Sequence, residues 1–121
     1  MSYIQIDLGG KLRGLKYNQL SLEVYAKNLN MEALQTSSIY ATFYAGLIGN
    51  SYSKREDADF TFEDTCLWVD EMYEKGRKDE IKQVCDMWAE THVYRDWLKE
   101  FQDKVRAEVE PEKKDIKKKM K

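Results

Sequence analysis

The sequence predicts an α+β fold that is predominantly helical: an N-terminal β-hairpin packed on a body of four or five helices, with a disordered basic C-terminal tail. Three observations predict it. Residues 3–17 alternate between apolar and polar side chains around a Gly-Gly pair, which is typical of a hairpin. Most later apolar residues recur at spacings of three and four, as on one face of a helix. Residues 111–121 are Lys-rich and too polar to pack.

Length and composition indicate one domain. The chain has 121 residues, of which 42% are hydrophobic and 35% charged, so a single hydrophobic core is expected. We therefore predict one mainly helical domain over residues 1–110, with the hairpin at about 3–17, and a flexible tail over residues 111–121.

The hairpin is predicted from its turn. Both residues of the Gly-Gly pair can adopt positive φ, as a two-residue hairpin turn requires. Ile4, Ile6 and Leu8 then share one side of the sheet, with Leu15 and Tyr17 as their cross-strand companions. Because an isolated hairpin is only marginally stable, this one is expected to lie against helices.

Two helices are predicted to follow the hairpin. The first covers residues 18–30, and Asn18 or Ser21 is suited to cap its start. The second begins at Ser37 or Ser38 and is apolar almost all round, which predicts a central buried helix. We expect glycines 46 and 49 to mark its C-terminal end, and residues 50–59 to form a polar surface loop.

The second half of the chain is predicted to be helical as far as Pro111. Thr61 is a good N-cap for a third helix, which Gly76 closes. Residues 78–110 fit either one long helix or two, with a break near Thr91–His92. Proline removes a backbone donor, so the helix is expected to stop there.

Composition and motifs speak against catalysis, metal binding and cofactor binding. The only histidine, His92, has no nucleophile motif nearby, and the Gly-Gly pair does not open a helix as a nucleotide loop would. The acid pairs 57/59, 63/64 and 70/71 lack calcium-loop spacing. Two cysteines, 66 and 85, are too few for a zinc site or a disulfide framework. We therefore predict a protein that is not an enzyme and has no catalytic, cofactor or metal residues.

Charge and hydropathy bear on location and partners. Neither a signal peptide nor a membrane span is apparent, which predicts a cytoplasmic protein. The formal net charge is -2, but residues 104–121 carry +4 and residues 1–103 carry -6. An acidic body is a poor surface for nucleic acid, because phosphate binding needs a basic face.

Candidate contact residues for a protein partner lie late in the chain. Aromatic residues recur there at helical spacing, which fits either the core or a helical face left free for a partner's helix. The lysines of the tail are candidates for contact with an acidic partner. The predicted partner-binding residues are Trp88, Tyr94, Trp97, Phe101, Lys113 and Lys114.

Two segments carry a resemblance to a known family. Residues 40–48 read YATFYAGLI, and after a polar loop residues 60–70 read FTFEDTCLWVD. The first resembles the L-x-YAGL helix of tail assembly chaperones from long-tailed bacteriophages, and the second resembles the helix that follows it in that family. The strand, glycine turn, strand and helix before them also fit, so the resemblance covers about residues 3–75. The later helix and the tail do not align with the family.

The resemblance implies a non-enzymatic, phage-encoded protein in the cytoplasm of the infected bacterium. Such chaperones bind and solubilise the helical tape measure protein, help to recruit tail tube subunits, and are absent from the mature virion. Many also occur in a longer frameshifted form. The expected partners are thus the tape measure protein and the tail tube protein, and a homo-oligomer is left open. Two alternatives remain: a small nucleic-acid-associated regulator that uses the basic tail, and a structural head–tail connector or completion protein.

Overall fold

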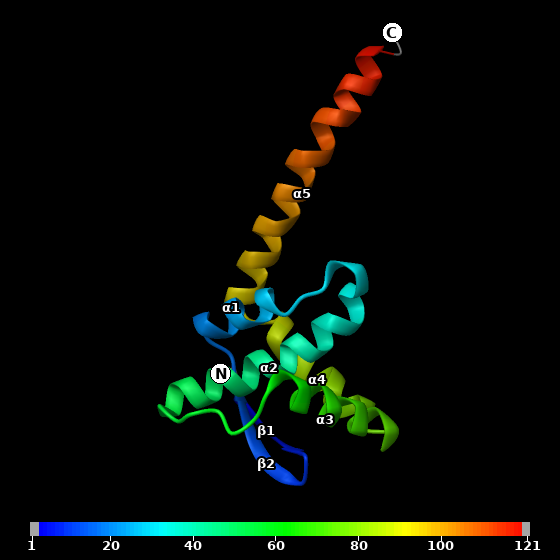
Figure 1. Cartoon of the computed structure of the whole chain (residues 1–121). Helices are drawn as coiled ribbons and strands as arrows, with labels where there is room; N and C mark the ends of the chain where they lie inside the picture. Colours follow the sequence, from blue (N-terminus) through cyan, green and yellow to red (C-terminus); the bar gives the residue numbers. More distant parts are fainter. Residues whose placement is uncertain (1–2, 120–121) are drawn as a thin grey trace.

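The computed structural model describes the backbone of residues 3–119 and the side chains of residues 3–107. Within these limits it contains an antiparallel hairpin, a short 3-10 helix and five α-helices (Figure 1). The predicted fold class, a hairpin on a mainly helical body, is confirmed. The elements are β1 (Tyr3–Leu8), β2 (Lys11–Lys16), α1 (Gln19–Lys27), η1 (Met31–Ala33), α2 (Leu34–Lys54), α3 (Phe62–Glu74), α4 (Lys78–Ala89) and α5 (His92–Lys119).

The hairpin forms as its turn residues predict. Gly9 and Gly10 adopt φ values of 63° and 79°, and Leu8 pairs with Lys11 on either side of them. Ile4 pairs with Leu15, as predicted, whereas Tyr17, the other predicted companion, lies just beyond the ladder. One face of the hairpin is buried in the core, and its most buried members are Ile6, Leu8, Leu15 and, just after β2, Tyr17.

Helix α1 begins at the predicted cap. The Asn18 side chain accepts a hydrogen bond from the backbone N–H of Ser21 (3.1 Å), and the Ser21 hydroxyl accepts one from the N–H of Asn18 (3.0 Å). This reciprocal capping box satisfies two backbone donors that the helix leaves unpaired. The Asn18 amide also donates to the carbonyl of Gly49 (3.1 Å), which ties the start of α1 to α2.

Helix α2 is longer at both ends than the sequence predicts. It begins at Leu34 after Ala33, which provides no side-chain cap, and ends at Lys54. The predicted cap at Ser37 or Ser38 and the predicted end at the two glycines are therefore wrong, and half of the predicted loop 50–59 is helical. Gly46 and Gly49 lie inside the helix where the hairpin approaches it. A Cβ added to Gly49 would overlap the Lys16 carbonyl and the Ser21 hydroxyl, so packing rather than termination explains these glycines.

Helix α3 has the predicted ends. The Thr61 hydroxyl accepts a hydrogen bond from the N–H of Asp64 (3.1 Å), and the Asp64 carboxylate accepts one from the N–H of Thr61 (3.0 Å). Asp64 in the first turn also complements the positive end of the helix dipole. Gly76 follows the helix with φ of 74°, the left-handed conformation common after helix C-termini.

Residues 78–110 form two helices rather than one. Helix α4 ends at Ala89 and α5 begins at His92, with the break at Glu90–Thr91. The helical backbone of α5 then continues past Pro111 to Lys119, so the predicted stop at this proline is wrong. An internal proline removes one backbone hydrogen bond and crowds the carbonyl four residues earlier, which can kink a helix without ending it. The surrounding Glu and Lys residues have high helix propensity and favour its continuation. A helical backbone does not report mobility, so the flexible tail at 111–121 stays a prediction.

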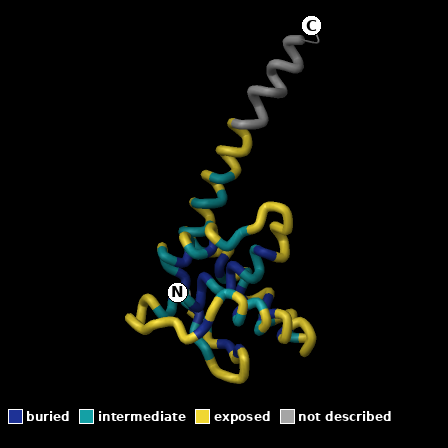
Figure 2. The backbone as a smooth tube through the Cα atoms, viewed as in Figure 1, coloured by how far each residue is buried: buried dark blue, intermediate teal, exposed yellow. Residues whose placement is uncertain are grey.

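The core lies between the buried face of the hairpin and helices α1 to α4. Figure 2 shows the buried residues gathered in this body, whereas residues 102–107 of α5 are exposed. Phe43, Leu15, Val69 and Val84 are fully buried, and Trp88 is 2% exposed. In the described part of the chain, no helix is both long enough and apolar enough to cross a membrane.

Candidate partner-binding site

A continuous series of aromatic rings runs from the core onto α5. The ring of Tyr17 lies 4.9 Å from that of Trp88, and Trp88 lies 5.3 Å from Tyr25. Tyr25 meets Trp97 edge-on at 5.5 Å, and Trp97 stacks on Phe101 at 5.4 Å between centroids. Such pairs contribute about 0.5–1.5 kcal/mol beyond the area they bury. The series therefore fixes the base of α5 on α1 and α4.

The series begins with buried rings and ends with half-buried ones. Trp88 is 2% exposed and lies in the core, which corrects its place among the predicted contact residues: a partner cannot reach it without opening the body. Tyr94, Trp97 and Phe101 are half-buried. Each contacts aromatic neighbours and stays partly accessible. Of the four predicted aromatic contact residues, these three remain candidates.

Beyond Tyr94, the accessible large apolar residues of α5 up to residue 107 form one stripe. It consists of Trp97, Leu98, Phe101 and Val105, which we call the α5 stripe; the first three are half-buried and Val105 is 44% exposed. Spacings of three and four place these residues on one side of the helix. Residues 102–104, 106 and 107 are exposed. The stripe thus reaches beyond the covered base of α5.

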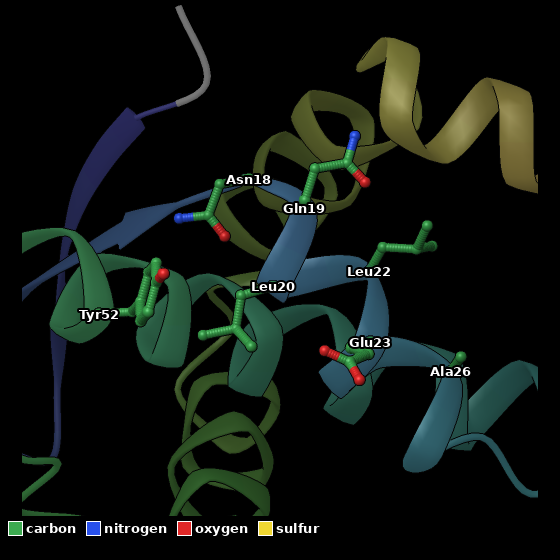
Figure 3. Close-up of a pocket in the computed structure, with 7 residues that line it drawn as sticks. All are labelled: Asn18, Gln19, Leu20, Leu22, Glu23, Ala26 and Tyr52. Carbon is green, nitrogen blue, oxygen red and sulfur yellow. The ribbon is translucent and has the colours of Figure 1, made fainter.

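A groove lies on the outer side of α1, which α5 contacts at its base. Figure 3 shows its lining side chains, six from residues 18–26 and one, Tyr52, from the last turn of α2. The groove has a volume of about 800 Å³ and is lined mainly by apolar atoms. Tyr52 is 65% exposed, and Leu20 and Leu22 are half-buried. We call it the α1 groove.

A second hollow of about 590 Å³ lies at the base of α5, among α2, α4 and α1. Tyr25, Ile39, Ile81 and Tyr94 contribute apolar surface to it. Burial, with a smaller effect from Asp86, raises the pKa of the lining Cys85 to about 11. This thiol therefore stays protonated at neutral pH and is a poor nucleophile there.

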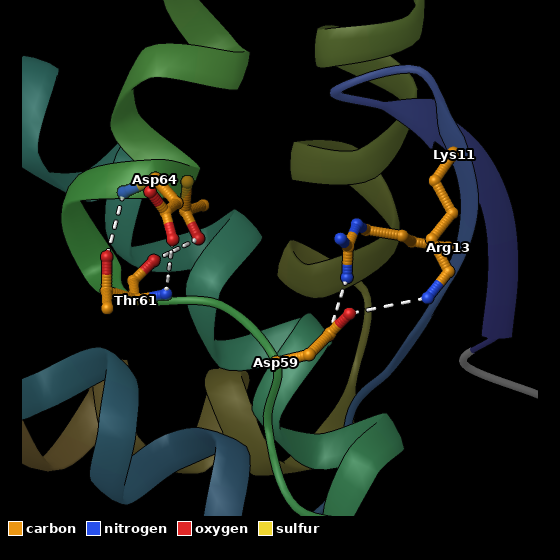
Figure 4. A network of polar contacts seen from close by, with 6 residues as sticks. Lys11, Arg13, Asp59, Thr61 and Asp64 are labelled. Atoms are coloured by element: carbon orange, nitrogen blue, oxygen red, sulfur yellow. Dashed lines mark hydrogen bonds and ion pairs between the residues drawn. The ribbon is translucent and has the colours of Figure 1, made fainter.

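Three of the six acidic residues considered for metal binding, one from each pair, have structural partners. Asp59 accepts hydrogen bonds from Arg13 (2.9 Å) and Lys11 (3.3 Å), and Asp64 caps α3 (Figure 4). The Arg13 and Lys11 side chains hold the pKa of the Asp59 carboxyl below its usual value. Asp70 accepts a hydrogen bond from the Tyr40 hydroxyl, and that bond is the main reason why the pKa of Tyr40 rises to about 12.

His92 is exposed at the start of α5. No group of three or more His, Cys, Asp or Glu side chains is placed to hold a metal ion within the part of the chain that was described. The side chains of Lys113 and Lys114, the two predicted basic contact residues, lie outside the described residues.

The α1 groove was not predicted from the sequence. The signal was present, because this short helix carries more apolar residues than one buried face can hold.

Comparisons with known proteins add no relative: no family model, curated protein or solved structure matches the chain.

Proposed function

We propose that this chain is a non-enzymatic tail assembly chaperone that binds and solubilises the tape measure protein of a long-tailed bacteriophage and helps to recruit tail tube subunits. The observation that carries the proposal is the α5 stripe, an apolar face that leaves the body. The resemblance of residues 40–48 and 60–70 to that chaperone family supplies the identity of the partner. On this proposal the protein acts in the cytoplasm of the infected bacterium and is absent from the mature virion.

The site suits a helical partner. A partner helix presents apolar residues at spacings of three and four, and these fit an apolar groove or a second helical face. The α5 stripe offers one such face, and the α1 groove offers further apolar surface on α1, the helix that the base of α5 contacts. Trp97 and Phe101 are stacked and supported by Tyr25, so little side-chain entropy is lost when a partner covers them.

The test is co-expression with a tape measure protein, the long helical partner that the proposal names. We expect that partner to be soluble only when the wild-type chain is present, and to co-purify with it. Phe101→Ala should weaken binding by about 30-fold, the effect of losing one anchor worth ~2 kcal/mol. Glu100→Ala, at an exposed neighbouring position on the same helix, is the matched control and should bind normally.

Two results would contradict the proposal. One is partner solubility that is the same with and without the chain. The other is equal binding by the Phe101 and Glu100 variants, which would exclude the α5 stripe. Mass spectrometry of purified virions separates a chaperone from a structural connector protein, because only the connector should be found in the particle.

A further inference from the structure

The two outer edges of the hairpin differ in how they are covered. Residues next to a two-residue turn form a hydrogen-bonded pair, and such pairs alternate along an antiparallel ladder. Leu8–Lys11, Ile6–Arg13 and Ile4–Leu15 are thus the bonded pairs of this register. The backbone N–H and C=O groups of the residues between them point away from the partner strand. On β1 these are Tyr3, Gln5 and Asp7, and on β2 they are Leu12, Gly14 and Lys16.

The β2 edge is closed. Its Lys16 carbonyl accepts a hydrogen bond from the Ser21 hydroxyl (3.2 Å), and α2 packs beside it at Gly49. Lys11 and Arg13 pair with Asp59 of the loop after α2 (Figure 4). Charged side chains and a covering helix are two devices by which proteins prevent strands from pairing at an edge.

The β1 edge is open apart from one contact. Arg77 donates a hydrogen bond to the Asp7 carbonyl (2.9 Å). Over residues 3–119, no other backbone hydrogen bond from Tyr3, Gln5 or Asp7 to a residue outside the hairpin is present, and β2 is the only element whose backbone lies close to that of β1 over several residues. The strand, YIQIDL, contains no Lys, Pro or Gly. Its one charged residue, Asp7, lies near the turn, so the strand from Tyr3 to Ile6 lacks the usual protection of an edge strand.

We propose that β1 is an interaction surface for a second copy of this chain, with the two β1 strands antiparallel and centred on Gln5. In this register Gln5 lies opposite the second copy's Gln5, and Tyr3 lies opposite its Asp7. The open N–H and C=O groups of Gln5 then bond their equivalents, and the N–H of Asp7 bonds the second copy's Tyr3 carbonyl. A two-fold interface of this kind uses the same patch on both copies.

Charge favours this arrangement over a parallel one. Parallel pairing in register would place Asp7 directly beside the second copy's Asp7, which is destabilising. Antiparallel pairing separates the two carboxylates by about 13 Å, four residues along the strands. It also brings the Tyr3 hydroxyl to the side of the sheet that carries the opposing Asp7. The Tyr3 ring itself leans toward Gly14 of β2 and leaves the edge free.

The surface lies away from the site proposed for the helical partner. Figure 1 shows the hairpin at the opposite end of the body from the projecting part of α5. The dimer and the α5 stripe are therefore independent, and loss of one should leave the other intact. A pairing of two six-residue strands is a small interface, so the dimer should be weak and concentration-dependent.

The test is sedimentation equilibrium over concentrations on the order of 10 μM to 1 mM, where small interfaces associate. The mass of the wild-type chain should rise from 14.3 kDa toward twice that value. Gln5→Lys and Gln5→Glu each place like charges opposite each other and should weaken association roughly tenfold. An equimolar mixture of these two variants should associate at least as well as the wild type. Gln83→Lys and Gln83→Glu, on the exposed side of α4, are matched controls and should behave as wild type.

A backbone variant tests the edge itself. Gln5→Pro removes an outward N–H, which an edge strand tolerates, and should abolish association while the helical circular dichroism signal is retained. In the wild type, hydrogen exchange at the amides of Gln5 and Asp7 should slow as concentration rises. A chain that stays monomeric at 1 mM, or association that is unchanged by the residue 5 variants, would overturn the proposal. Slower exchange at Gln5 and Asp7 only when the helical partner is added would instead assign the edge to a strand of that partner, and would also overturn it.

Discussion

The hairpin and α5 are both attached to the helical body, but by different kinds of contact. The hairpin approaches α2 so closely that Gly46 and Gly49 have no room for a side chain. Helix α5 is held by large rings that are only partly covered, among them Trp97 and Phe101. A close backbone contact cannot rearrange for a partner without strain. Half-buried rings, in contrast, can be covered by a partner without rearrangement of the body. We therefore expect substitutions at the hairpin contact to affect stability, and substitutions on α5 to affect binding.

The largest expected effect is at Trp88, where the two regions meet. Trp88→Ala removes a ring that contacts Tyr17 beside the hairpin and Tyr25 beneath α5. It should lower the free energy of unfolding by about 3–5 kcal/mol, the usual range for a large aromatic side chain lost from a core. Urea titration followed by circular dichroism measures this value. A loss below 1 kcal/mol would mean that the ring is not a core residue.

The next effect tests the close contact alone. Gly49→Ala adds a Cβ where the Lys16 carbonyl and the Ser21 hydroxyl already lie. In an exposed helix this change would be stabilising, but here overpacking should cost about 1–3 kcal/mol in the free energy of unfolding. Thr36→Ala, at an exposed position of the same helix, is the control for helix propensity. A Gly49 variant that is more stable than wild type would show that the hairpin does not approach α2 this closely.

Tyr17 gives a pH-dependent measure of the same contact. Its hydroxyl donates to the Thr42 carbonyl (2.8 Å), and burial raises its pKa well above the ordinary value of 10.0. Above about pH 10 the unfolded chain releases this proton while the folded chain keeps it, so folding stability falls as pH rises further. Tyr17→Phe should cost about 1 kcal/mol at neutral pH and should reduce the loss of stability between pH 10 and 11. An unchanged slope would place the ionising group elsewhere.

The smallest expected effect on stability is on α5. Phe101→Ala removes the outer ring of the stacked pair and should change the free energy of unfolding by less than about 1 kcal/mol, because this ring is only half-buried. Thermal unfolding measures it, and the same variant should still bind its partner about 30-fold more weakly. A large loss of stability together with unchanged binding would show that this ring serves the fold and not the partner.

Local features of this fold were predictable from sequence. The Gly-Gly pair predicts the hairpin because its φ requirements involve only two residues, and Thr61 predicts the start of α3 because its bond to Asp64 spans three residues. The end of α2 was predicted wrongly for the opposite reason. The role of Gly49 depends on Lys16, 33 residues earlier in the chain, and nothing near the glycine in sequence signals that contact.

The candidate site was predictable only in part. Trp88, Tyr94, Trp97 and Phe101 share a helical spacing, which predicts a common face but not which neighbours cover it. The structure covers Trp88 from both sides because the helix breaks at Glu90–Thr91 and α5 takes a new direction. The sequence left open whether residues 78–110 form one helix or two. The spacing alone therefore could not tell that Trp88 is buried and Trp97 is partly exposed.

The three tryptophans of this chain lie in three different surroundings, which makes each a separate optical reporter. Trp68 lies under the guanidinium of Arg13, 4.4 Å from its ring centroid, and beside Gly9 at the hairpin turn. Trp88 is enclosed in the core, and Trp97 is partly open to water. Chains that keep one tryptophan, with Phe at the other two positions, would emit fluorescence from the hairpin turn, the core or the α5 stripe alone. Hairpin docking, global unfolding and partner capture could then be followed as three distinct signals in one protein.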